Sequence, residues 1–125
     1  MGLLSGLMGN ASEVNVDELQ QELGPIMADE ETIQMAYKEI RDMYIFTNKR
    51  LILIDKQGLT GKKTEYHSIP YKSISHFAVE TNGHFDLDAE LKIWISSSSE
   101  PIEKELKSGT DVVGIQKTLA QFMLF

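Results

Sequence analysis

The sequence has no cysteine, and it has only three prolines and one tryptophan in 125 residues. Without cysteine there is no disulfide framework, thiolate metal site or thiol nucleophile, which fits a reducing cytoplasm. Long apolar runs are also missing: the longest, LILI at 51–54 and FMLF at 122–125, fall far short of the ~20 residues that cross a bilayer. The first residues lack the basic region and cleavage pattern of a signal peptide. We therefore expect a cytoplasmic protein held together by one apolar core.

Positive charge is missing from the first part of the chain, where residues 1–37 hold seven acids and no lysine or arginine. Residues 38–72 hold eight basic and four acidic side chains, whereas residues 73–125 hold four basic and eight acidic ones. The net charge of −7 disfavours binding to nucleic acid, because the phosphate backbone repels an acidic chain. The two oppositely biased regions instead favour contact between copies of the protein.

Apolar side chains at helical spacing predict a short amphipathic helix near the start of the chain. Val16, Leu19 and Leu23 fall on one helical face, and Asn10 or Ser12 precedes them as an N-cap. The last residues predict a second helix, in which Thr110 or Asp111 is the N-cap. Its apolar stripe is Val112, Ile115, Leu119 and Phe122.

Between these helices the apolar period changes to two, which indicates β-strands. Asn82-Gly83 is a strong hairpin signal, and Pro70 breaks a strand region because proline cannot donate to a central ladder. About seven strands result. They are expected within residues 31–37, 43–55, 64–81, 89–95 and 102–109. A final helix with one apolar face suits the closing of a small barrel or sandwich of such strands.

Three stretches carry a family resemblance: FTNKRLILIDKQGLTGKKTEYHSIPYKSI, ETNGHFDLDAELKIWIS and EPIEKELKSGTDVVGIQKTL. Together with the order of the elements they resemble the bacterial pleckstrin-homology domain family over nearly the whole chain. The resemblance implies a PH-like barrel of two near-orthogonal antiparallel sheets capped by the last helix. It also implies ring-like homo-oligomers and no established catalysis.

The predicted division of the single domain follows from this resemblance. Residues 1–24 form a helical arm, 31–109 the β barrel and 110–125 the C-terminal helix. One feature departs from related eukaryotic domains, which bind phosphoinositides through a basic cluster at the first hairpin. Here Lys38 and Arg41 alternate with Glu39 and Asp42, so the resemblance does not carry the lipid site to this chain.

Two stretches resemble a phosphate-binding loop and a metal site, but each is better explained as a turn between strands. Residues 58–63, GLTGKK, lack the four-residue spacing and the following helix of a phosphate-binding P-loop, and they read as a glycine-bearing hairpin loop. His84, Asp86 and Asp88 would share one side of an extended segment as metal ligands. They follow Asn82-Gly83, however, which favours a solvated turn.

Catalysis finds no support in the remaining motifs. His67 and His76 are isolated, and the four serines at 96–99 form a turn with no histidine near them in sequence. We therefore expect no enzyme, no cofactor and no metal.

Trp94 breaks the strand pattern, because it lies beside Glu90 and Lys92 and opposite the apolar set of its strand. An exposed tryptophan favours a binding contact. The alternative is that the arm of residues 1–24 folds over Trp94 within the same subunit. With Trp94, the basic residues Lys49, Arg50, Lys62, Lys63 and Lys72 complete the candidate partner interface.

Three hypotheses remain, and the preferred one is a non-catalytic module that assembles into a ring. The second is an adaptor whose basic patch binds an anionic membrane surface. The third and least favoured is a nucleotide-binding enzyme that uses the glycine-lysine loop.

Overall fold

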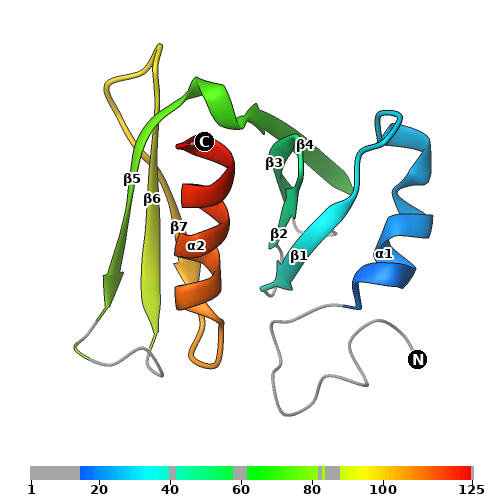
Figure 1. Cartoon of the computed structure of the whole chain (residues 1–125). Helices are drawn as coiled ribbons and strands as arrows, with labels where there is room; N and C mark the ends of the chain where they lie inside the picture. Colours follow the sequence, from blue (N-terminus) through cyan, green and yellow to red (C-terminus); the bar gives the residue numbers. More distant parts are fainter. Residues whose placement is uncertain (1–14, 40–41, 58–61, 82, 84–87, 125) are drawn as a thin grey trace. The chain divides into compact units, whose positions relative to one another are not determined.

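The computed structural model describes residues 15–39, 42–57, 62–81, 83 and 88–124 (Figure 1). The chain divides into two compact units, Met1–Ser68 and Ile69–Phe125. The first unit contains a four-stranded sheet, here sheet A, and the second a three-stranded sheet, sheet B. The predicted mainly β fold, with seven antiparallel strands in two sheets and a helix near each end, is confirmed.

The described part of the first unit contains, in chain order, helix α1 (Val16–Glu22) and a short 3-10 helix, η2 (Gly24–Ile26). Four strands follow, and their spatial order in sheet A matches their order in the chain. They are β1 (Ile33–Lys38), β2 (Asp42–Thr47), β3 (Arg50–Gln57) and β4 (Lys63–Pro70). A strand therefore follows the glycine-lysine stretch, as expected for a hairpin. Residues 58–61 themselves lie outside the described part of the chain.

Asn15 caps α1, and the cap prediction of Asn10 or Ser12 was therefore wrong. The side chain of Asn15 accepts a hydrogen bond from the backbone N–H of Glu18 at 3.1 Å. This bond satisfies one of the N–H groups that the first helical turn leaves without a partner. Sequence spacing alone did not separate three capping residues, because asparagine and serine serve equally well at that position.

The two central strands of sheet A, β2 and β3, are apolar on both faces. On one face, Ile45 of β2 and Ile52 of β3 stand opposite each other and pack with Leu19 of α1. On the other face, Tyr44 and Leu53 form the neighbouring pair and are also buried. Burial on both faces explains why the apolar runs in β2 and β3 are continuous, because a strand exposed on one face would alternate apolar and polar residues.

The second unit continues with the 3-10 helix η3 (Tyr71–Ser73) and three strands. The strands are β5 (Ile74–Thr81), β6 (Ala89–Ile95) and β7 (Ile102–Leu106), in that order in sheet B. Thr81 pairs with Ala89, so the predicted β5–β6 hairpin is present. Its connection is longer than a two-residue turn, and residues 82 and 84–87 lie outside the described residues.

Helix α2 (Val112–Met123) packs in this second unit against η3 and β5. Asp111 is its N-cap and accepts a hydrogen bond from the Gly114 N–H at 2.9 Å. The predicted stripe is buried at Val112, Ile115 and Leu119. The aromatic ring of Phe122 continues the stripe and stacks on Tyr71, with ring centroids 5.3 Å apart.

Candidate interaction surface

Alternation along β6 divides sheet B into an apolar face and a charged face. Ala89, Leu91 and Ile93 are buried, whereas Glu90, Lys92 and Trp94 project to the opposite side. We call this opposite side the outer face of sheet B.

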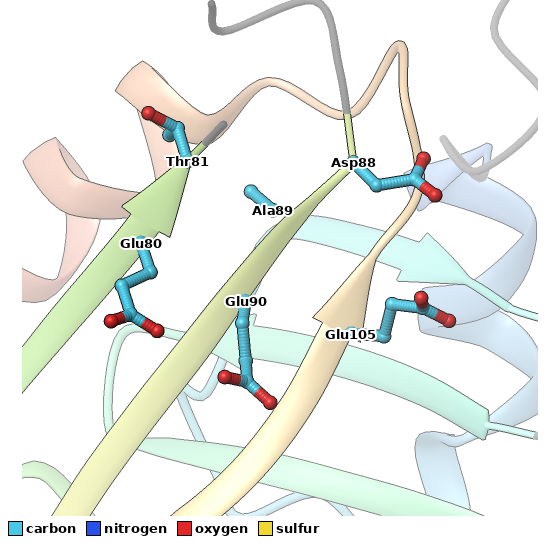
Figure 2. Close-up of a pocket in the computed structure, with 6 residues that line it drawn as sticks. All are labelled: Glu80, Thr81, Asp88, Ala89, Glu90 and Glu105. Atoms are coloured by element: carbon cyan, nitrogen blue, oxygen red, sulfur yellow. The ribbon is translucent and has the colours of Figure 1, made fainter. Parts of the chain in front are cut away.

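The register brings three glutamates together at one end of the outer face. Glu80 of β5 pairs with Glu90 of β6, and Glu90 in turn pairs with Glu105 of β7. The row borders an open depression of about 430 Å³, which we call the acidic pocket. Figure 2 shows the carboxylates of this row standing along the three strands. The residues that line the pocket are Glu80, Thr81, Asp88, Ala89, Glu90 and Glu105.

Lysines at the edges of this row reduce its negative charge. Lys92 Nζ lies 3.1 Å from Glu80 Oε1, and this hydrogen bond together with the charge of Glu80 raises the pKa of Lys92. Lys107 Nζ lies 3.3 Å from Glu105 Oε1. Like charges placed directly across strands repel one another, and exposed ion pairs offset little of that repulsion. The acidic pocket is therefore suited to contact a cationic surface.

An aromatic pair occupies the other end of the outer face. His76 and Trp94 are cross-strand partners, and their rings stack with centroids 4.3 Å apart and an interplanar angle of 16°. The Ser75 hydroxyl donates to the backbone carbonyl of Trp94 at 3.1 Å, which ties β5 to β6 beside the stack. Trp94 is thus partly covered by His76, whereas the described part of the N-terminal arm, α1, packs in the first unit.

The predicted basic residues are exposed, with one exception. Lys49 lies in the β2–β3 turn, and Lys62 and Lys63 lie at the start of β4. Lys49 precedes β3 and Lys62 follows it, so the two lysines lie at opposite ends of that strand, ~25 Å apart. Lys72 is exposed in η3 of the second unit. The membership of these residues in an interface stays a prediction.

Arg50 is the exception, because its guanidinium binds a buried acid. Arg50 Nε lies 2.8 Å from Glu31 Oε2, and Nη2 lies 3.1 Å from Oε1. The Thr47 hydroxyl also donates to Glu31 at 2.7 Å, and the Ala28 N–H donates at 2.9 Å. Glu31 is 3% exposed. We call this arrangement the Glu31–Arg50 node.

Burial by itself raises the pKa of Glu31, since it disfavours the charged carboxylate. The hydrogen bonds from Arg50, the Ala28 backbone and Thr47, with the Arg50 charge, outweigh burial and hold the pKa below its ordinary value of 4.5. The node joins the segment after α1 to the β2–β3 hairpin. Sequence reasoning missed it, although an acid at the buried parity of β1, two residues before Ile33, is a signal that a partner is required.

The structure adds no support for the remaining sequence motifs among the residues that it describes. His84 and Asp86 lie outside the described residues. Within the described ranges, no group of three histidines and acids is arranged to hold a metal ion. The described helices include none that is long and apolar enough to cross a membrane.

Comparisons with known proteins agree with this architecture. Residues 2–123 match the family described as "Bacterial PH domain". The uncharacterized protein YjqA of Bacillus subtilis is 54% identical over 121 residues, which cover 96% of this chain and 97% of YjqA. Another uncharacterized Bacillus subtilis protein, YozO, is 32% identical over 103 residues, covering 82% of this chain and 88% of YozO.

Solved structures extend the likeness to three dimensions. A protein with a pleckstrin-homology domain from Shewanella loihica superposes with a TM-score of 0.83 and 70% identity, covering 90% of this chain and 96% of that one. A pleckstrin-homology domain from Shewanella amazonensis gives a TM-score of 0.79 and 65% identity, covering 99% of this chain and 100% of that one.

Proposed function

Because the chain belongs to the bacterial PH domain family, we propose that it is a non-catalytic cytoplasmic interaction module that assembles with copies of itself into a ring. The observation that carries the proposal is the acidic row of Glu80, Glu90 and Glu105 on the outer face of sheet B. It contrasts with residues 38–72, where basic side chains outnumber acidic ones by eight to four.

Contact between these two surfaces has a geometric consequence. The acidic pocket and the exposed lysines lie on different elements, so a contact that joins them is head-to-tail. A head-to-tail contact leaves one unused surface at each end of a pair, and successive copies close into a ring when the rotation between neighbours permits. Opposite charges on the two surfaces also suppress contacts in which like surfaces meet.

The stack of His76 on Trp94 supplies the apolar part of the contact. Tryptophan is enriched among the residues that dominate binding energy, and here its ring lies on the same face as the acidic pocket. The polar groups of the pocket then provide orientation, while Trp94 provides buried apolar area. Neither role requires a chemical reaction at this face.

Light scattering at physiological salt tests the proposal, and we expect a mass several times 14.1 kDa. Glu90→Lys places a cation in the middle of the acidic row, and it should lower the mass toward that of a single chain. Glu100→Lys is the matched control, because Glu100 is an exposed glutamate in the β6–β7 turn outside the pocket. The control should keep the wild-type mass.

Charge exchange identifies the opposite surface. Lys62→Glu with Lys63→Glu should also lower the mass, and combining both changes with Glu90→Lys should restore part of it by re-pairing opposite charges. A wild-type protein that stays a single chain at high micromolar concentration contradicts the proposal. If that single chain binds vesicles with phosphatidylserine but not neutral vesicles, and the lysine changes abolish binding, the membrane-adaptor hypothesis replaces it.

A further inference from the structure

The face of sheet A that α1 covers continues onto β4, where the helix does not cover it. Leu19 packs with side chains from β1, β2 and β3, and among the described residues this apolar cluster takes none from β4. Tyr66, in the middle of β4, is 56% exposed. Ile26, in η2 between α1 and β1, is 46% exposed.

Arg50 shows that Ile26 and this side of β4 border the same strip of surface. Its Nη2 donates to the Ile26 carbonyl at 2.7 Å, and its Nη1 donates to the Ser68 hydroxyl at 2.8 Å. Tyr66 precedes Ser68 by two positions, so both side chains project to the same side of the strand. The strip therefore combines an aromatic ring and a branched aliphatic side chain beside the covered part of the face. Its residues are Ile26, Thr64, Tyr66 and Ser68, and we call it the β4 strip.

The chain has an apolar segment directly before α1. Residues 1–12 contain no charged side chain, and four large apolar residues fall within six positions: Leu3, Leu4, Leu7 and Met8. These residues lie outside the described part of the chain, which begins at Asn15, the N-cap of α1. The segment is thus tethered to the helix that ends at the boundary of the β4 strip.

The tether is long enough to reach the strip. Seven residues separate Leu7 from Asn15, and the eight Cα–Cα steps between them span up to ~27 Å when extended. The tether starts at the N-cap of α1, so it must run back along the seven residues of the helix, ~10 Å, and cross from β1 to β4, ~15 Å, since neighbouring strands lie ~4.8 Å apart. The sum of about 25 Å is within the reach of the extended chain. A tether of this length also gives the segment an effective concentration on the order of millimolar at the strip, which favours the same subunit over a second copy.

We propose that residues 3–8 pack over the β4 strip of their own subunit and thereby extend the cover that α1 provides on sheet A. Leu3, Leu4, Leu7 and Met8 then contact Tyr66 and Ile26, and the burial of apolar surface drives the contact. The proposal does not depend on ring assembly, because both partners belong to one chain. Any partner that binds β4 would then have to displace residues 3–8 from the strip.

A disulfide scan tests the contact cleanly, because the chain has no cysteine of its own. Leu7→Cys is combined with Thr64→Cys, on the proposed side of β4, or with Glu65→Cys, on the opposite side. A disulfide requires Cα atoms within about 7 Å and Cβ atoms that face each other. Under mild oxidation we expect roughly tenfold more cross-link within one chain for the Thr64 pair than for the Glu65 pair.

The outcomes of the scan separate this proposal from ring assembly. Equal cross-linking of the two pairs, cross-linking of neither, or cross-links only between chains would overturn the proposal, whatever mass the wild type has. Conversely, a wild type that is a single chain but forms the Thr64 cross-link supports the cover while contradicting the ring.

A second measurement does not depend on cysteine variants. Deletion of residues 2–12 should uncover the β4 strip and increase the binding of a dye that reports exposed apolar surface. Tyr66→Ser in the deleted chain should remove most of the increase, whereas Val113→Ser should not, because Val113 is 56% exposed on α2 of the other unit. A deletion that leaves dye binding unchanged counts against the cover.

Discussion

Sheets A and B differ in how many of their faces are buried. Sheet A buries both faces of its central strands β2 and β3, and α1 covers one of these faces through Leu19. Sheet B buries one face, and it places Glu90, Lys92 and Trp94 on the other. The strand sequences show the reason: β3 contains LILI, which is apolar on both sides, whereas β6 reads AELKIWI, in which apolar and polar residues alternate. Sheet A therefore buries apolar side chains on both sides of its central strands, whereas sheet B carries charged side chains on one side.

The largest effect should come from weakening the cover on sheet A. Leu19→Ala removes a side chain that is 1% exposed and leaves a cavity between α1 and the sheet. We expect the free energy of unfolding to fall by about 2–4 kcal/mol. Denaturant titration measures it, and Val113→Ala on the exposed side of α2 serves as the control. A loss below ~0.5 kcal/mol would show that α1 contributes little to folding.

The Glu31–Arg50 node should rank second. Glu31→Gln keeps the size of the side chain but removes the charge that Arg50, Thr47 and the Ala28 N–H bind. The expected loss is about 1–3 kcal/mol, because charge-assisted hydrogen bonds in a buried site are replaced by neutral ones. Glu65→Gln, at an exposed site on β4, changes the net charge by the same amount and is the control for charge alone. Equal stability of Glu31→Gln and the wild type would contradict a stabilising role of the Glu31–Arg50 node.

Acid should act on sheet A through the same carboxylate. The pKa of Glu31 is lower in the folded chain than its ordinary value of 4.5, so the unfolded chain binds the proton more readily. The stabilisation from Glu31 is therefore fully present above about pH 4.5 and is lost as the pH falls through the lower folded value. Unfolding free energies from pH 7 downward should decline less steeply below that point in Glu31→Gln. Parallel curves for the two proteins would contradict this assignment.

The smallest effect on folding should come from the outer face of sheet B. Glu105→Gln removes one charge from the acidic row, and we expect a change within about ±0.5 kcal/mol, since exposed ion pairs contribute little. The same variant should weaken self-association measurably in light scattering. A large loss of stability without any change in mass would mean that this face resembles sheet A more than the alternation indicates.

The sequence predicted those features that depend on local patterns. The β5–β6 hairpin and the stripe of Val112, Ile115 and Leu119 follow from periods of two and 3.6, which a short window contains. Features that need distant pairing were not predicted. Glu31 and Arg50 lie 19 positions apart, and nothing local connects them.

The acidic row of Glu80, Glu90 and Glu105 was not predicted either, because it also depends on pairing between distant positions. It requires the register of three strands, and a shift of one residue would place each glutamate on the opposite face. Composition did indicate an excess of acids after residue 73, but it did not indicate that three of them share one line across the sheet.

The stacked imidazole and indole have a practical consequence. Trp94 is the only tryptophan in the chain, so all indole emission originates from one spot between β5 and β6. Whatever docks beside that spot, or lifts His76 away from it, will change the colour or intensity of the emitted light. The unlabelled protein thus reports on the occupancy of its own outer surface in real time.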